Sequence, residues 1–240
     1  MPTLLITGAN RGIGWGVARL LAERGWHVHA TCRRPDRAEA LQALAAAHAG
    51  RVTVHALELL DFAGIKRLGQ RLEAAAIDVL FNNAGVMNMA QRRYDPALTI
   101  QDFGHTDAED WTKVFQVNVI APMKLAEALI EPIARSERKV IITATSVMGS
   151  IRLNTTGRWH HYRTTKAAVN QMMRGMAVEL RPRGITCFPL HPGSVRTDMN
   201  FARAPLSIDE SAAGIVRVIE TAGPEQSGRY MMWNGEEMPW

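Results

Sequence analysis

The feature of this sequence that most restricts its fold is an apolar run followed at once by a glycine-rich turn, TLLITGANRGIGWG, at residues 3–16. Four glycines fall within nine positions there. Glycine is used where the backbone must turn sharply or come close to another group. The turn separates a predicted strand from a predicted helix. In an open parallel sheet this is where the phosphates of a nucleotide bind, because free N–H groups and the positive helix end attract anions. A tight turn without a ligand is the alternative interpretation.

Apolar strand patterns alternate with helix patterns along the chain. Strands are predicted near residues 3–7, 27–31, 52–57, 79–82, 139–145, 185–191 and 229–232, and helices near 12–24, 37–48, 62–75, 106–130, 159–180 and 208–221. The strands lack polar alternation, as expected for strands buried on both faces. The pattern predicts a doubly wound α/β Rossmann fold, with a seven-stranded parallel sheet and helices on both faces. We find no repeat or linker and expect residues 1–240 to form a single domain.

Two helix starts and one long connection are marked in the sequence. Thr106 with Glu109, and Ser207 with Glu210, have the spacing of capping boxes. The irregular stretch from 85 to 105 is longer than an ordinary connection. It is either a functional loop or a surface excursion.

Composition narrows the function classes. The formal net charge of +5 is dispersed apart from a cluster at residues 33–37, and no basic stripe carries interleaved aromatics, which disfavours nucleic acid. A small anionic ligand accounts for a local cluster equally well. No apolar stretch is long enough to span a membrane, and the first strand begins at Thr3, which leaves no room for a signal peptide. Cys32 and Cys187 lie in apolar strands, which favours reduced thiols. We expect a cytoplasmic protein.

Further motifs follow the glycine turn in a set order. They are Asn82-Asn83-Ala84-Gly85, Asn118, Ser146, Tyr162-x3-Lys166 and His191-Pro192-Gly193-Ser194-Val195-Arg196-Thr197. Together with TGANRGIG they resemble the short-chain dehydrogenase/reductase family over roughly residues 7 to 197. The phrase YRTTKAAVN and the ending from Gly228 to Pro239-Trp240 also resemble a C-factor and sniffer-like carbonyl reductase branch.

The resemblance implies an NAD(P)-binding domain with named site residues. It implies cofactor contacts from Gly8, Asn10, Arg11, Gly12, Ile13, Gly14, Arg33, Asp61, Asn83, Ala84, Gly85, Tyr162, Lys166, Pro192, Gly193, Val195 and Thr197. By resemblance, Asp61 bonds the adenine amino group and Thr197 the nicotinamide carboxamide. Asp61 can also be a simple helix N-cap. Catalytic roles are implied for Asn118, Ser146, Tyr162 and Lys166.

The end of the second strand indicates which nicotinamide cofactor is used. An acidic residue there would bond the ribose 2′-hydroxyl, whereas an arginine accommodates a 2′-phosphate. Residues 29–34 read HATCRR and contain no acid. We therefore expect NADPH or NADP rather than NAD, with Arg33 and Arg11 on the 2′-phosphate. Two solvated surface arginines are the alternative.

Tyr162 and Lys166 are four positions apart on a predicted helix and so share a face. A ketone reduced by hydride must gain a proton, and a phenol can donate it. We expect the Lys166 ammonium to lower the pKa of Tyr162 from its ordinary value near 10. Ser146 can bond the same carbonyl oxygen. Taken alone, the Tyr-Lys pair could be an ordinary exposed helix pair.

Two polar features beside this pair are open to more than one interpretation. By resemblance, Asn118 holds a water that links Lys166 to solvent, but a buried asparagine satisfied by backbone fits the same residue. His160 and His161 cannot face one way on a helix, so we expect no metal site. The substrate walls are expected at Met87 and the loop after it, at Met148 and Trp159, and at 199–206; these apolar residues could equally be core.

The sequence thus favours an NADPH-dependent carbonyl reductase acting on a small aldehyde or ketone, with Tyr162 as proton donor. One alternative is an alcohol dehydrogenase or a biosynthetic ketoreductase. Another is a dinucleotide-binding signalling protein resembling C-factor. The resemblance also implies a homodimer or homotetramer built on helices 106–130 and 159–180.

Overall fold

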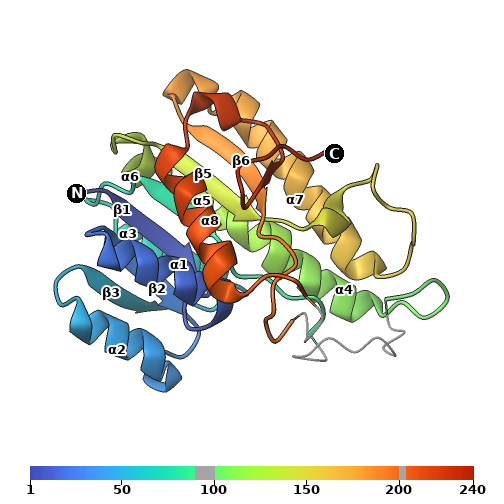
Figure 1. Cartoon of the computed structure of the whole chain (residues 1–240), viewed down its shortest axis with the longest axis horizontal. Coiled ribbons are helices and arrows are strands. Elements are labelled where there is room, and N and C mark those ends of the chain that lie inside the picture. Colours follow the sequence, from blue (N-terminus) through green and yellow to red (C-terminus); the bar gives the residue numbers. More distant parts are fainter. Residues whose placement is uncertain (90–100, 200–203) are drawn as a thin grey trace.

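Within the described residues, seven parallel strands form one sheet in the order β3-β2-β1-β4-β5-β6-β7 (Figure 1). The computed structural model describes residues 1–89, 101–199 and 204–240. The strands are β1 (Thr3–Thr7), β2 (His27–Cys32), β3 (Val52–Ala56), β4 (Val79–Asn82), β5 (Val140–Ala144), β6 (Thr186–His191) and β7 (Met231–Met232). The chain winds outward from β1 to β3 and then returns to the other side of β1. This reversal opens a crevice at the carboxyl ends of β1 and β4, where ligands bind in such sheets. The predicted fold class is confirmed.

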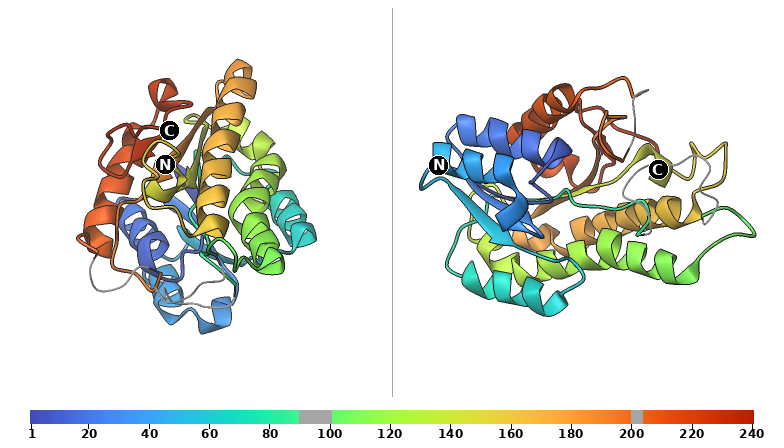
Figure 2. Two further views of the ribbon diagram at one scale, coloured as in Figure 1. Left: turned by 90° about the vertical axis from the view of Figure 1, so that its right-hand side faces the viewer. Right: turned by 90° about the horizontal axis from the view of Figure 1, so that it is seen from below.

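Helices cover both faces of the sheet (Figure 2). One face carries α1 (Gly12–Glu23), α2 (Glu39–Ala47) and α8 (Ile208–Thr221); the other carries α3 (Phe62–Arg71), α4 (Ala108–Phe115), α5 (Ala121–Ala128), α6 (Ile130–Ala134) and α7 (His160–Glu179). Each face has its own apolar core. Leu4 and Ile6 of β1 point into the first core and Leu5 into the second, because successive strand residues face opposite ways. All three are fully buried.

The predicted helix 106–130 is three elements in the structure. Asp107, not Thr106, caps its start, because the Asp107 side chain accepts hydrogen bonds from the backbone N–H groups of Glu109 and Asp110. A π-helical turn, Gln116–Ile120, then separates α4 from α5. Pro122 follows it and has no N–H to donate to the carbonyl four residues earlier, which favours this widening. The turn carries Asn118.

The start of α8 agrees with the prediction from the sequence, and the length of the last strand does not. Ser207 and Glu210 form the predicted capping box at the start of α8. The last strand is only Met231–Met232, shorter than predicted. Four 3-10 turns complete the described structure: Pro35–Arg37, Val147–Gly149, Arg181–Arg183 and Pro224–Gln226. Among the described residues, no helix combines the length and apolar character needed to cross a membrane.

Candidate active site

The glycine turn packs directly against the segment that follows β4. The Asn83 side chain donates to the Thr7 carbonyl at 2.9 Å, and the Ala84 N–H donates to the Thr7 hydroxyl at 3.0 Å. A Cβ on Gly8, whose φ is +67°, would lie 3.0 Å from the Cβ of Ala84. A Cβ on Gly14 would lie 2.5 Å from both the Asn83 amide nitrogen and the Gly8 carbonyl oxygen. Two of the glycines therefore allow β1 and β4 to approach at the switch point.

The start of α1 fits an anionic ligand. Its N-cap, Arg11, makes no side-chain cap, and the first turn holds no acidic residue. The first N–H groups of the helix therefore have no side-chain acceptor. A Cβ on Gly12 would have only Thr197 near it, at 3.8 Å. Asn10 is exposed at the tip of the turn, and Ile13 packs on the first core. These residues fit the diphosphate of a dinucleotide.

A polar pocket of about 330 Å³ lies at the ends of β2 and β3. It is lined by Arg33, Ala56, Leu57, Glu58, Asp61, Gly64, Arg67, Leu68 and Arg71. Arg33 and Asp61 are thus brought together, as the resemblance implies. Asp61 caps α3 by accepting from the Gly64 N–H at 2.8 Å, and this bond holds the pKa of its carboxyl below the usual range. It also pairs with Arg67 at 2.8 Å.

Arg11 does not join Arg33 in that pocket. Its guanidinium pairs with the Asp198 carboxylate at 2.5 Å, and both side chains are more than half exposed. The pair connects the glycine turn with the loop after β6. An exposed pair of this kind contributes little to stability, so Arg11 can exchange its partner at small cost.

The loop after β6 is held by its own packing. The Pro192 carbonyl accepts from the Ser211 hydroxyl of α8 at 2.7 Å. Gly193 has φ +87°, and a Cβ there would lie 2.4 Å from Leu206 and 3.0 Å from Trp233. Val195 is buried. The packed residues 192–195 therefore hold the backbone that leads to Thr197, which lies beside Gly12.

Ser146, Tyr162 and Lys166 meet at the ends of β5 and α7. The Ser146 side chain lies close enough to the Tyr162 hydroxyl to lower its pKa. The Lys166 ammonium lies 5.5 Å from the centre of the Tyr162 ring and donates to the Ala144 carbonyl at 2.8 Å. Tyr162 and Lys166 are both buried. An ordinary exposed helix pair is therefore not what the structure contains.

Burial controls the ionisation of both groups. It raises the pKa of Tyr162 to about 12, against a smaller lowering by the Ser146 hydrogen bond. It lowers the pKa of Lys166 to about 8. The prediction that Lys166 lowers the pKa of Tyr162 is wrong here, because desolvation is the larger effect and the ammonium is bonded to Ala144 instead. Tyr162 is consequently a protonated acid at neutral pH.

The Asn118 side chain is hydrogen-bonded to backbone, as one of its two interpretations expects, and the water link to Lys166 stays a prediction. Its carbonyl oxygen accepts from the Val86 N–H, and its amide donates to the Val86 carbonyl, both at 2.8 Å. The remaining amide hydrogen goes to Thr165 at 3.1 Å. A Cβ on Gly85 would lie 3.2 Å from the Asn118 oxygen and 3.4 Å from the Lys166 nitrogen. Asn118 thus holds the turn after β4 against Lys166.

The start of α7 depends on residues that the sequence reading missed. Gln101 is fully buried, its side-chain oxygen accepts from the Tyr162 N–H at 3.1 Å, and its carbonyl accepts from the His160 N–H at 2.8 Å. Gln101 lies some sixty positions from the helix that it caps, and a cap so distant in sequence leaves no local signal.

His161 makes a buried pair with Asp110, at 3.0 Å. The other Asp110 oxygen accepts from the Met89 N–H at 2.7 Å. The ring of Trp111 stacks on His161, with centres 5.0 Å apart. The pair ties the loop after β4 to the catalytic helix.

Part of the predicted substrate wall, at 90–100 and 200–203, lies outside the described residues. Met87, Met148 and Trp159, the other predicted wall residues, are half-buried.

Comparison with known proteins assigns the family. The short chain dehydrogenase model matches residues 2–205, and the chain belongs to the short-chain dehydrogenase/reductase family. It is therefore an oxidoreductase, of a family that uses NAD or NADP.

Three relatives narrow the comparison. The C-signal of Myxococcus xanthus is 36% identical over 164 residues, which are 68% of this chain and 93% of that protein. The carbonyl reductase Sniffer of D. melanogaster superimposes with a TM-score of 0.89 at 31% identity, covering 100% of both chains. A carbonyl reductase from Pseudomonas aeruginosa PAO1 in complex with NADP gives a TM-score of 0.83 at 36% identity, again covering 100% of both chains.

Proposed function

We propose that this enzyme is an NADPH-dependent carbonyl reductase that converts a small aldehyde or ketone to an alcohol. The observation that carries the proposal is the buried Tyr162 hydroxyl, beside the Ser146 side chain and one helical turn from Lys166. A protein that only binds a dinucleotide has no need of a desolvated acid at this place. The similarity to Sniffer and to the Pseudomonas enzyme supports the same substrate class.

The cofactor contacts follow the features described above. The uncapped start of α1 would hold the diphosphate, and the pocket with Arg33 and Asp61 would hold the adenosine end. Arg33, at the end of a strand that carries no acid, favours a 2′-phosphate and so NADPH. The Pseudomonas relative is described with NADP bound. A bound reduced nicotinamide supplies the hydride for such a reaction.

The residues of the chain supply the proton and the orientation. Tyr162 gives the proton of its hydroxyl to the carbonyl oxygen, and Ser146 donates a hydrogen bond to that oxygen, which keeps it in place. Lys166 binds the cofactor ribose, and its ammonium stabilises the phenolate that is left on Tyr162 after the proton transfer. Asn118, with both amide hydrogens engaged, acts as a positioning residue for Gly85 and Lys166.

NADPH consumption measured with a panel of aldehydes, ketones and quinones tests the proposal. We expect turnover with several of them. Efficient oxidation of alcohols with little carbonyl reduction would favour the alcohol dehydrogenase alternative, and turnover restricted to acyl thioester ketones would favour a biosynthetic ketoreductase. The similarity to C-signal motivates the signalling alternative. Tight NADPH binding with no turnover of any compound would select that alternative.

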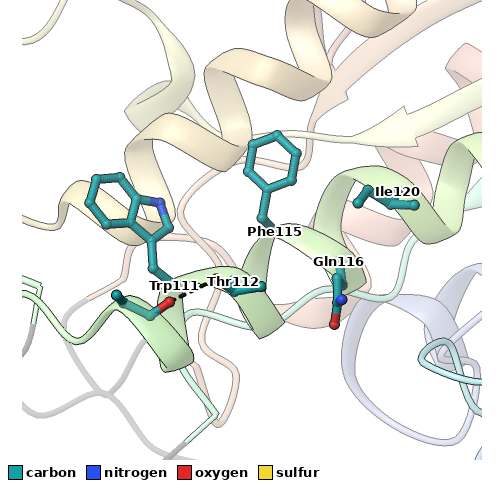
Figure 3. Close-up of a pocket in the computed structure, with 6 residues that line it drawn as sticks. Trp111, Thr112, Phe115, Gln116 and Ile120 are labelled. Atoms are coloured by element: carbon teal, nitrogen blue, oxygen red, sulfur yellow. Dashed lines mark hydrogen bonds between the residues drawn. The ribbon is translucent and has the colours of Figure 1, made fainter.

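We also propose that the enzyme forms a dimer or tetramer through the outer face of α4. A groove of about 400 Å³ lies there, lined by Ala108, Trp111, Thr112, Phe115, Gln116 and Ile120 (Figure 3). Apolar side chains provide most of this lining. Light scattering on the purified protein decides the oligomeric state, and Phe115→Glu is expected to shift the assembly toward the monomer.

A further inference from the structure

The end of the chain reads GRYMMWNGEEMPW, and of its residues only Trp233, beside Gly193, entered the site described above. Tyr230 within it is the largest fully buried side chain among the described residues. Its hydroxyl donates to the carbonyl oxygen of Ser146. The Ser146 side chain lies beside the Tyr162 hydroxyl. A residue far along the sequence thus contacts the backbone of the proposed catalytic serine.

A small buried network surrounds this contact. The side chains of Asn170 and Thr145 lie beside the Tyr230 oxygen. The Thr145 hydroxyl donates to the Asn170 oxygen at 2.7 Å, and the Asn170 amide donates to the Gly149 carbonyl at 3.2 Å. The network therefore holds the turn 146–150 at both its start and its end. Burial raises the pKa of Tyr230, so its hydroxyl stays protonated and remains a donor.

The last two residues hold the same turn from the other side. The Ser150 hydroxyl donates to the main-chain oxygens of Pro239 and Trp240, at 2.8 and 3.0 Å. The Arg152 N–H donates to the Trp240 oxygen at 3.0 Å. The rings of Tyr230 and Trp240 lie 5.5 Å apart. Trp240 thus packs on the residue that bonds Ser146.

The turn also presses on the catalytic helix. A Cβ on Gly149 would lie 2.8 to 2.9 Å from the backbone and Cβ of Lys166. The turn and α7 consequently share one packed contact, and a shift of the turn changes the separation of Ser146 from Tyr162. Misplacement of a catalytic group by about 1 Å can cost about a hundredfold in rate.

We propose that Tyr230 and Trp240 are positioning residues for Ser146: the Tyr230 hydroxyl orients the Ser146 peptide, and Trp240 holds the Tyr230 ring. The inference rests on the proposed reductase function for its effect on rate, and on the contacts above for its structural part. Neither residue reaches the reacting atoms.

Tyr230→Phe keeps the ring and removes only the hydroxyl. We expect kcat to fall about tenfold to a hundredfold, with Kd for NADPH unchanged. In a Ser146→Ala background the same substitution is expected to change kcat less than about twofold, because an alanine at 146 has no hydroxyl whose position could matter. Ser136→Ala, which removes another buried hydroxyl at the opposite end of the sheet, is the matched control and should leave kcat unchanged.

Trp240→Phe and Trp240→Ala supply a second comparison. The alanine variant is expected to lose several-fold in kcat. The phenylalanine variant should keep most of the wild-type kcat, since it still places an aromatic ring against Tyr230. Equal losses in the wild-type and Ser146→Ala backgrounds, or an unchanged kcat in Tyr230→Phe, would overturn the proposal.

One readout is independent of turnover. The Cζ resonance of isotope-labelled Tyr162 reports the hydrogen bond at its oxygen. It should move in Ser146→Ala, move in the same direction in Tyr230→Phe, and stay in place in Ser136→Ala. If Tyr162 is undisturbed by Tyr230→Phe, the positioning role is wrong even where the reductase function holds. If the resonance moves but no carbonyl is reduced, the proposed function fails and the positioning role stands.

Discussion

The two sides of the crevice at the sheet differ in whether their charged groups are exposed to solvent or buried. On the side of β1 to β3, the groups suited to the cofactor are in the open: Arg11 is more than half exposed, and Asp61 pairs with an exposed Arg67. On the side of β4 to β7, Tyr162 and Lys166 are buried, and burial raises the pKa of Tyr162 to about 12 and lowers the pKa of Lys166 to about 8. Exposed charges can change partners when a ligand arrives. Buried groups are held by the side chains packed around them and present one geometry for chemistry.

This difference in exposure indicates that cofactor specificity and proton donation depend on different residues. Substitutions on the first side should change affinity and cofactor choice while leaving the proton donor intact. On the second side, substitution of Tyr162 should change turnover while leaving cofactor binding nearly intact, whereas substitution of Lys166 should affect both, because Lys166 is also proposed to bind the cofactor ribose. Each of the following experiments can break that division.

The largest effect is expected from Tyr162→Phe. Removing the general acid should lower kcat by about a hundredfold to ten-thousandfold, because phenylalanine has no hydroxyl proton to give to the carbonyl oxygen. Kd for NADPH, followed by fluorescence titration, should change less than about twofold. A variant that keeps most of its kcat would exclude Tyr162 as the acid.

Arg33→Asp tests the exposed side. Reversing this charge should reduce the preference for NADPH over NADH about tenfold to a hundredfold in kcat/KM, since a charged hydrogen bond contributes about 1.5–3 kcal/mol. Arg37→Asp makes the same change in net charge outside the pocket and serves as the control. Equal cofactor ratios in the two variants would show that the pocket does not read the 2′-phosphate.

Gly14→Ala tests the close approach of β1 and β4. The added Cβ would meet the Gly8 carbonyl at 2.5 Å, so we expect a loss of about 1–3 kcal/mol in stability and about tenfold weaker NADPH binding. Gly175→Ala, on α7 with no atom within 4 Å, is the matched control and should stabilise the fold by up to about 1 kcal/mol. Thermal unfolding and cofactor titration measure both. Identical behaviour of the two variants would remove the packing argument.

The smallest effect concerns the charge of Lys166. Its pKa of about 8 means that the ammonium is lost as the pH rises through 8, so Kd for the anionic cofactor should increase a few-fold there. An unfolded lysine keeps its proton to about pH 10.5, so the free energy of unfolding should rise between pH 8 and 10.5. Both changes should disappear in Lys166→Met. A wild-type affinity that is flat across pH 8 would contradict the account.

Much of this picture could be read from the sequence because its signals are local. Apolar runs, glycines and the Tyr-x3-Lys spacing predicted the sheet, the turn at its switch point and the shared face of Tyr162 and Lys166. The capping box at Ser207 was confirmed, whereas at Thr106 the cap moved to the next residue, because Asp107 offers a better acceptor for the same N–H groups.

The remainder depends on contacts that link distant segments. Gln101 caps α7 and Tyr230 bonds Ser146 from 61 and 84 positions away. The pKa of Tyr162 depends on how deeply the finished fold buries it, which the spacing to Lys166 cannot reveal. The π-helical turn at Gln116–Ile120 was not predicted, because the apolar periodicity of the helix continues across it. Only the effect of Pro122 on the backbone hydrogen bonds could have indicated the turn.

The most direct test of the central claim follows the hydride itself. NADPH that carries deuterium at its transferable position is incubated with the enzyme and the aldehyde or ketone most active in the panel. The account predicts an alcohol with one deuterium on the former carbonyl carbon, formed by the wild type and suppressed in Tyr162→Phe. Alcohol without the label, or labelled alcohol at equal rates from both proteins, would contradict it.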